Sequence, residues 1–539
     1  MSAGGHNGEG GAARRQSFLD IGGPNSITNF ASSLQRAHIY MEQAVNDGAS
    51  MYEGQASGDL SPCTSPQPVL PYAGANGTSG KGASSYGSTA HSHRQGGGCS
   101  EQFRNFDFPH DEETAVAEPL HRTASRRESI SSTVIGFGSS TAPQTIFNSV
   151  NTLMGIAMLS LPFAFRLTGW VLATVQLCLV AWVTSKTAKI LGLILRKNKH
   201  LFSYGDIAYA YGGSKFHAFA TFTFTLDLLG ALLSLVLIFA DSFSILFPRV
   251  NAVVFKLLIV AVTFVTSFLP LSTVSFISLF GVMCSGAVLV CVGICGFFST
   301  KTPGSLLYPA ATSLWPSSFL DILLSWGLFM APWGGHPVFP ELYRDMRHPR
   351  KYDMCCNSAF LFTFLLDYAI GAVGYLMFGA DAKDSLTKNL MSNKAYPDWV
   401  SPACCTLLGL LLASKLALIV RPVITVAERL IPSKESEFIT YKNGSRASES
   451  PVKAIFARII VLSLVFVMSI LFTSFGQIMA FFGSAICFTI CVTLPLLFHM
   501  KFNKEEMSIY LRGLTAVGVV FGVIGAVGGT YAAVVETPS

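Results

Sequence analysis

The sequence predicts an all-α polytopic membrane protein with about eleven transmembrane helices. Half of its 539 residues are hydrophobic, only 13% are charged and 42 are Phe, so the chain is too apolar for a soluble protein of its length. Long apolar stretches also recur throughout residues 142–535. Basic residues beside the ends of membrane spans account for the net charge of +6, which leaves nucleic-acid binding without support.

Residues 1–140 are expected to form a disordered, cytosolic tail, followed by a transmembrane domain over residues 141–536. Gly, Ser, Asn, Gln and Pro dominate the tail, and no apolar periodicity persists long enough to bury a core. Ser17 and Ser129 each lie two residues after an arginine pair, a pattern that basophilic kinases recognise. These serines are candidate phosphorylation sites, and kinases or docking proteins are candidate partners of the tail.

The apolar stretches define the eleven expected spans. In this register Lys and Arg gather on one side of the membrane, which predicts a cytosolic N-terminus and a luminal C-terminus. Only a turn around Pro270 separates the fourth span from the fifth, so the count depends on that turn. The spans are expected at about residues 142–170, 171–195, 216–247, 254–271, 273–299, 318–340, 355–379, 399–424, 456–474, 478–499 and 513–535.

The first span has a polar middle. It carries Asn148, Asn151 and Gly155 but no charge before Arg166, so it is long enough to cross a bilayer yet poorly suited to face lipid. A Gly beside polar side chains is a place where a helix can unwind and turn backbone groups toward a ligand. The alternative is a face of small residues that packs against other helices.

The sixth span has a second interruption. Residues 325–340 contain three prolines and the adjacent pair Gly334 and Gly335, which one continuous helix cannot accommodate. Two interrupted spans, each opening one of two five-span halves, predict a 5+5 inverted-repeat transporter with one additional helix. Its substrate site is expected where the two interrupted spans cross.

The predicted geometry suits a zwitterionic amino acid. Where the first span restarts near Gly155, free backbone N–H groups suit a carboxylate. Where its first half stops, free carbonyls and the side chains of Asn148 and Asn151 suit an ammonium group or a small cation. The room for the substrate side chain is expected to be set by Met330, Trp333, Gly334 and Gly335.

Ionisable residues inside the spans are candidates for proton coupling, because each is costly in a membrane unless it is paired or hydrated. His336 lies beside the second interruption and is either a proton carrier or a neutral, structural imidazole. Asp241, near the luminal end of the third span, is either a coupling or an interfacial residue. Asp227 and Asp367 are also coupling candidates, unless pairing with a basic residue of the eighth span, Lys415 or Arg421, makes them structural.

The chain resembles the amino acid/auxin permease family, and most closely its fungal vacuolar amino acid transporters and vesicular inhibitory amino acid transporters. The matching stretches are TIFNSVNTLMGIAMLSLPFAFRLTGW, YGDIAYAYGG, FMAPWGGHPVFPELYRDMRHPRKY and GYLMFGADAKDSLTKNL, together with the tail segment GGPNSITNFASSLQRA, a candidate docking motif. One departure is Ala157, where the family often has a second glycine and where a methyl group narrows the site.

The resemblance implies a leucine-transporter-like fold, with a proton gradient as the driving force and no cofactor. It implies exchange of protons for neutral amino acids across an acidified organelle membrane, here the vacuolar membrane, so that the lumen is loaded. The positions that match the family's substrate site are Asn151, Met154, Gly155, Met330, Gly334, Gly335 and His336.

Three functions are consistent with these features. The first is the secondary active transporter just described, and the second is a proton-coupled exporter of amino acids from the vacuole. The third is a membrane sensor of amino acids that signals through its long tail. An enzyme is not expected, because no paired carboxylates, nucleophile elbow or metal-spaced His/Cys cluster stands out.

Overall fold

A computed structural model describes residues 32–33, 35–36, 39, 138–431 and 451–535. The described residues form helices, without a β-strand among them, and an isolated bridge pairs Ser140 with Met346. The candidate phosphorylation sites Ser17 and Ser129, and nearly all of the expected tail, lie outside the described residues.

The first interrupted span is broken where the sequence predicts it. Thr141 caps the first helix in a capping box with Gln144, and Met154 and Gly155 separate that helix from the next turn. Gly169, with φ of 70°, turns the chain between the first span and the second. The first half of the domain comprises α2 (Ala142–Leu153), η2 (Ile156–Ser160), α3 (Leu161–Lys197), α4 (Tyr204–Leu246), α5 (Ala252–Thr266) and α6 (Leu271–Phe298).

The second half also opens on an interrupted span. Between α7 (Phe319–Met330) and α8 (Phe339–Arg344), the chain forms only the short turns η3 (Ala331–Trp333) and η4 (His336–Val338). The remaining elements are η5 (Pro349–Lys351), α9 (Tyr352–Phe378), η6 (Gly379–Asp381), α10 (Leu386–Ser392), α11 (Val400–Leu430), α12 (Pro451–Leu471), α13 (Phe475–Phe482), the π-helical η8 (Gly483–Thr493), α14 (Leu494–Phe502) and α15 (Ile509–Val535).

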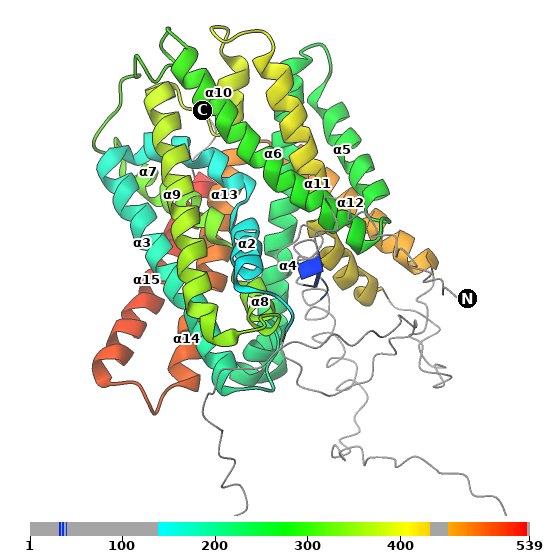
Figure 1. Cartoon of the computed structure of the whole chain (residues 1–539), viewed down its shortest axis with the longest axis vertical. Helices are drawn as coiled ribbons and strands as arrows, with labels where there is room; N and C mark the ends of the chain where they lie inside the picture. Colours follow the sequence, from blue (N-terminus) through cyan, green and yellow to red (C-terminus); the bar gives the residue numbers. More distant parts are fainter. Residues whose placement is uncertain (1–31, 34, 37–38, 40–137, 432–450, 536–539) are drawn as a thin grey trace, which may run out of the picture. The chain divides into compact units, whose positions relative to one another are not determined.

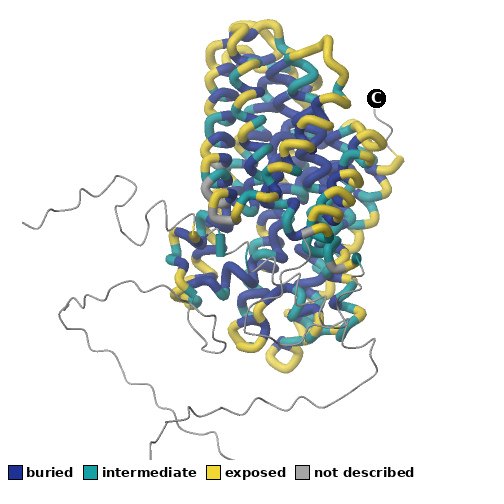
Figure 2. Tube along the Cα trace, turned by 90° about the vertical axis from the view of Figure 1, so that its right-hand side faces the viewer, coloured by how far each residue is buried: buried dark blue, intermediate teal, exposed yellow. Residues whose placement is uncertain are grey.

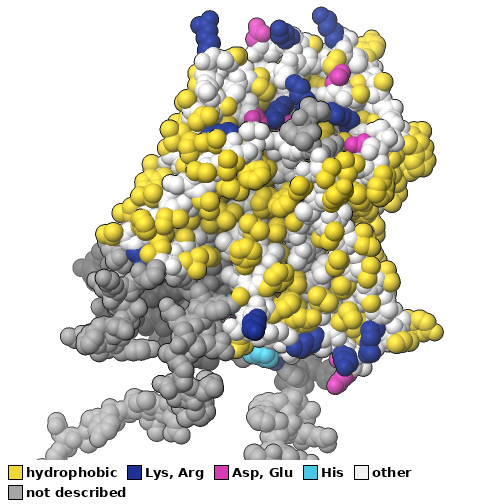
Figure 3. All heavy atoms as spheres, turned by 180° about the vertical axis from the view of Figure 1, so that it is seen from behind, with side chains coloured by type: hydrophobic (Ala, Val, Ile, Leu, Met, Phe, Trp, Pro, Cys, Tyr) yellow, Lys and Arg dark blue, Asp and Glu magenta, His cyan; other side chains and the backbone are white. Residues whose placement is uncertain are grey.

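The helices are suited to a membrane. Within the described residues, eight helical segments are each long and apolar enough to cross a bilayer. The two interrupted spans and the shorter α5 complete the predicted set, so eleven crossings remain a prediction. On the face in Figure 3, hydrophobic side chains form a broad belt, and most of the charged side chains lie toward its two ends.

The interrupted spans lie inside the bundle. In α2 the side chains of Asn148, Ser149 and Asn151 are all buried, and α2 packs against α9 and α8. Buried residues run through the middle of the bundle, whereas exposed residues mark its rim and outer helices (Figure 2). The polar middle of the first span therefore faces protein and an internal cavity rather than lipid.

Two ends of the bundle are distinguished by short helices. In Figure 1, α8 lies toward one end and α10 toward the opposite end. These are called the α8 end and the α10 end below. In the predicted orientation the α8 end faces the cytosol and the α10 end faces the lumen.

Candidate functional site

A cavity of about 220 Å³ lies where the two interrupted spans meet. Both interruptions contribute to its wall, and α4, α6, α11, α13 and η8 complete it. Most of the wall is apolar, with side chains such as Phe224, Leu411 and Met479. A cavity smaller than the roughly 300–1,000 Å³ typical of drug-sized ligands suits a molecule as small as one amino acid.

The interruption of the first span opens onto this cavity. Gly155 has an extended backbone, with φ of −100° and ψ of −176°. A methyl group added at Gly155 would have the Ala157 nitrogen, 3.9 Å away, as its nearest neighbour, so the glycine faces open space. Ala157 also lines the cavity, so its methyl group takes room there, as the sequence predicts.

The interruption of the sixth span is crowded. A Cβ at Gly335 would lie 2.8 Å from Thr152 Cγ2, and one at Gly334 would lie 3.0 Å from Cys487 Sγ. A side chain at Gly335 would therefore force Thr152 to shift, and one at Gly334 would press against Cys487. The glycine pair therefore brings the two interruptions together.

The structure brings together six of the residues predicted to bind substrate. Met330, Trp333 and His336 are fully buried but are not among the residues that line the cavity. Trp333 stacks on Phe360 of α9, with ring centroids 5.5 Å apart. The predicted residues in the wall are Asn148, Asn151, Met154, Gly155, Gly334 and Gly335.

His336 is hydrogen-bonded to the second span. Its Nε2 lies 2.9 Å from Thr187 Oγ1 and 3.1 Å from the carbonyl oxygen of Thr184, both in α3. Its ring also packs against Phe339 and Phe360. This geometry supports a structural role for His336, in which it ties the sixth-span interruption to α3.

Three ionisable side chains among the described residues line the cavity: Asp227 of α4, Lys415 of α11 and the Cys487 thiol of η8. Lys415 Nζ donates to Asn151 Oδ1 at 2.7 Å, to the Asn151 carbonyl at 3.1 Å and to the Met154 carbonyl at 3.5 Å. Asp227 accepts from the Cys487 thiol at 3.6 Å. The hypothesis that Asp227 pairs with Lys415 is wrong for this structure, because Lys415 binds the end of α2.

Asp367 lies away from the cavity. It is buried in α9, and its Oδ2 has no hydrogen-bond partner among the described residues. The ion pairs of the described residues do not join it to Lys415 or Arg421. Arg421 instead donates to the carbonyl oxygen of Leu269. Any coupling role of Asp367 would therefore have to act at a distance from the cavity.

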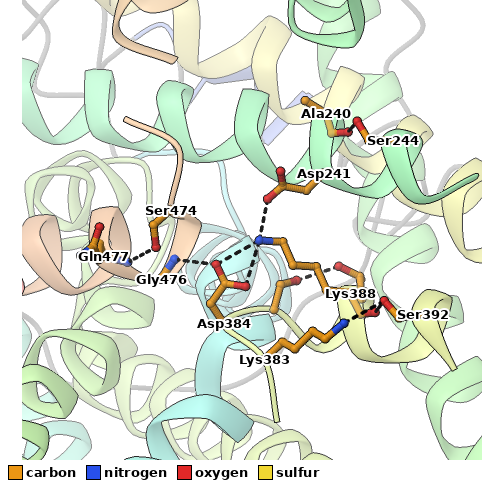
Figure 4. Close-up of polar contacts among 12 residues, drawn as sticks. Ala240, Asp241, Ser244, Lys383, Asp384, Lys388, Ser392, Ser474, Gly476 and Gln477 are labelled. Atoms are coloured by element: carbon orange, nitrogen blue, oxygen red, sulfur yellow. Dashed lines mark hydrogen bonds and ion pairs between the residues drawn. The ribbon is translucent and has the colours of Figure 1, made fainter. Parts of the chain in front are cut away.

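Asp241 belongs to a charged cluster at the α10 end (Figure 4). Lys388 Nζ lies 2.7 Å from Asp241 and 2.9 Å from Asp384, and Asp384 also accepts from the backbone N–H of Gly476. The cluster ties α4, α10 and α13 together. Burial lowers the pKa of Lys388, but Asp241 and Asp384 outweigh burial, so the pKa lies above its ordinary value and the ammonium stays charged.

Two residues of the tail motif contact the α8 end. Arg36 Nε pairs with Asp345 at 2.9 Å, and its Nη2 donates to Ser140 Oγ at 3.0 Å. Ser33 is fully buried, lies 2.5 Å from Ser140 Oγ, and accepts from Asn148 Nδ2 at 2.8 Å. The candidate docking motif therefore meets the transmembrane domain of its own chain, beside the cavity.

The sequence suggested Lys415 only as a partner of an aspartate, whereas the structure places it in the cavity wall. The available signal was a single lysine in the middle of an apolar stretch of α11. The contacts of Ser33 and Arg36 could not be predicted from the neighbouring sequence. Only the resemblance of the tail segment indicated that this segment binds something.

Two plant proteins are similar in sequence to this chain. Amino acid transporter AVT1D of Arabidopsis thaliana is 27% identical over 404 residues, which cover 72% of this chain and 69% of that protein. Amino acid transporter AVT1J of the same plant is 26% identical over 422 residues, covering 74% and 91%.

Two solved structures are also similar. A substrate-bound, outward-open Na⁺-coupled sialic acid symporter has a TM-score of 0.40 at 13% identity, covering 74% of this chain and 90% of its own. The inward-facing conformation of Mhp1 has a TM-score of 0.38 at 12% identity, covering 74% and 91%.

The family comparison covers most of the chain. The model of the family described as transmembrane amino acid transporter protein matches residues 138–535, which is the whole helical domain described above. This chain therefore belongs to the transmembrane amino acid transporter family.

Proposed function

We propose that this protein is a secondary active transporter that exchanges protons for neutral amino acids across the vacuolar membrane and so loads the lumen. The observation that carries the proposal is the cavity between the two interrupted spans, with an apolar wall and a few polar groups. Such a site at the crossing of discontinuous helices is the expected place for a small substrate. The names of the Arabidopsis relatives support amino acids as the substrate class.

The substrate ammonium is proposed to bind on the side of Asn148 and Asp227. The Oδ1 atom of Asn148 is buried and has no hydrogen-bond partner among the described residues, although its Nδ2 is bonded to the tail. Asp227 contributes a carboxylate to the same cavity. A buried acceptor without a partner is costly, and a substrate ammonium would satisfy it.

The substrate carboxylate is proposed to bind where the first span restarts. The first N–H groups of a helix have no partner inside it, and the open space at Gly155 leaves room for the ligand. Apolar residues of α4, α11 and α13 then surround the side chain. Because this wall is apolar, neutral amino acids with apolar side chains are the preferred substrates.

Transport in liposomes tests the proposal. Purified full-length protein is reconstituted, a pH gradient is imposed, and uptake of labelled neutral amino acids is followed with and without a protonophore. The expected result is accumulation that depends on the gradient and collapses with the protonophore. A protein that binds amino acids but shows no flux under either sign of the gradient contradicts the proposal.

The sign of the effective gradient distinguishes import from export. Exchange into an acidic lumen requires accumulation in vesicles that are acidic inside, whereas an exporter accumulates substrate only when the outside is acidic. Uptake into isolated vacuoles, with and without a proton-pump inhibitor, checks the direction in the native membrane.

A sensor is the second candidate, and the tail contacts favour keeping it. Because Ser33 bonds to Asn148, occupancy of the cavity and the position of the tail are physically linked. Deletion of residues 1–135 separates the two functions. Transport persists after the deletion if the protein is a transporter, whereas a sensor loses its signal to cytosolic partners.

A further inference from the structure

The ammonium of Lys415 occupies a special position at the end of α2. The carbonyls of Asn151 and Met154 belong to the last turn of that helix, where carbonyl groups no longer have helical partners. Lys415 lies in α11, more than 260 residues later in the chain, and its ammonium donates to both carbonyls. Its third hydrogen bond goes to the side-chain Oδ1 of Asn151. Three oxygens thus surround one ammonium.

These contacts differ from an ordinary buried ion pair. A cation inside a membrane domain usually pairs with a carboxylate, because an unpaired charge is costly there. The ion pairs among the described residues do not include Lys415. Its partners are instead neutral oxygens at the negative end of a helix dipole, the type of ligand with which interrupted helices coordinate coupling cations.

We propose that Lys415 is the built-in coupling cation of this transporter. Its protonated ammonium holds the end of α2 against α11, in the role that a bound metal cation would otherwise fill. Loss of one proton converts the ammonium to a neutral amine and removes the charge that binds the two carbonyls. The end of α2 is then free to move relative to α11.

The proposal rests on the proposed proton-driven transport and names the residue that couples the proton to the substrate. The released proton passes to the cavity, where the other ionisable groups in the wall are the Asp227 carboxylate and the Cys487 thiol. Among the described ionisable groups, these two and Lys415 line the cavity. Transport is therefore expected to need no sodium.

The same geometry assigns a role to Asn151. Its Oδ1 accepts a hydrogen bond from Lys415, which makes Asn151 a positioning residue for the lysine. Substitution of Asn151 is expected to shift the pH at which transport is half-maximal. Substrate binding at a pH that keeps Lys415 protonated is expected to persist.

The test uses reconstituted full-length protein and the variant Lys415→Met, which keeps a long side chain but removes the amine. The matched control is Lys394→Met, which removes an exposed lysine from a connecting segment. Two transport modes are compared: accumulation driven by a pH gradient, and exchange of labelled for unlabelled substrate without a gradient. We expect Lys415→Met to lose accumulation and pH dependence while it retains exchange, and Lys394→Met to behave like the wild type.

Three outcomes separate the possibilities. If the wild type shows no flux under any pH gradient, the proposed function itself fails. If the wild type accumulates substrate and Lys415→Met accumulates it equally well, only the role of Lys415 fails. Wild-type accumulation that requires sodium also overturns that role. If Lys415→Met does not fold, Asn151→Ala decides, because an unchanged pH profile in that variant contradicts the proposal.

Discussion

The two interrupted spans differ in what holds them. The interruption of the sixth span is closely packed except where Gly334 and Gly335 line the cavity: His336 is hydrogen-bonded to α3, and Gly335 lies against Thr152. The interruption of the first span faces open space at Gly155, and its end is held by the ammonium of Lys415. This contrast indicates that the sixth span is the fixed wall of the site and that the first span is the part that can move.

The contacts at the start of α2 extend the contrast. The first span is also held at the α8 end, through Asn148 and Ser140, by residues of the tail. All these contacts of the first span are polar or charged, so water or a ligand that supplies equivalent hydrogen bonds can replace them. The close packing of the sixth span has no such replacement.

Removal of the His336 imidazole is expected to have the largest effect on stability. His336→Ala deletes a fully buried ring and its bonds to α3, which should lower the free energy of unfolding by about 2–4 kcal/mol. Thermal unfolding of the purified protein, followed by tryptophan fluorescence, measures the loss.

His336→Gln is the matched control, because an amide can still bond to Thr187 and to the carbonyl of Thr184. We expect it to recover much of the stability and to retain transport driven by a pH gradient. A stable His336→Gln variant that has lost gradient-driven transport, but not exchange, would show instead that the imidazole carries the coupled proton.

A methyl group at Gly335 tests whether close approach of the two spans is essential. Gly335→Ala places a carbon 2.8 Å from Cγ2 of Thr152, a β-branched side chain with little freedom in a helix. Overpacking of this kind should cost about 1–3 kcal/mol and should reduce the maximal transport rate. The double variant Gly335→Ala with Thr152→Ser removes the methyl group in the way and should recover most of both losses.

The paired interruptions could be predicted because their cause is local. Proline at positions 332 and 337 cannot donate backbone hydrogen bonds, and the structure has only short turns there. Pro340 lies in the first turn of α8, where a missing N–H group leaves no helical bond unmade. Gly155 among polar residues likewise marked the first interruption correctly. The same local rules could not predict which way His336 would point, because the direction of a side chain at a break depends on the helix packed against it.

The partner of the first interruption could not be predicted for a different reason. Lys415 meets Asn151 across 264 positions of sequence, and no periodicity or motif connects two such distant residues. The hydrogen bond between Asn148 and Ser33 spans 115 positions and likewise could not be predicted from sequence patterns. Sequence patterns located the walls of the site, whereas its electrostatic contacts depend on the tertiary fold.

Release of the tail tests the polar attachment of the first span at the α8 end. Arg36 is 30% exposed, and Asp345 keeps its bond from Ser140 when Arg36 is removed. Arg36→Ala should therefore lower the free energy of unfolding by only about 0.5–1 kcal/mol. The expected result is faster labelling of a cysteine placed at the buried Ser33, in a chain whose Cys63, Cys99 and Cys178 are serine. Gln35→Ala is the neighbouring control and should leave the labelling rate unchanged. Equal labelling in both variants would mean that Arg36 does not hold the tail.

Gly155→Ala is expected to have the smallest effect on stability. It also tests directly whether the first interruption faces open space. The backbone angles at Gly155 suit any residue, and the new methyl group would have no neighbour closer than 3.9 Å, so the melting temperature should hardly change. The methyl group projects into the space proposed for the substrate. Transport of amino acids with bulky side chains should therefore fall more than transport of glycine or alanine, in a competition assay with a panel of neutral amino acids. A variant that unfolds, or that slows all substrates equally, would mean that the first interruption is packed as tightly as the sixth.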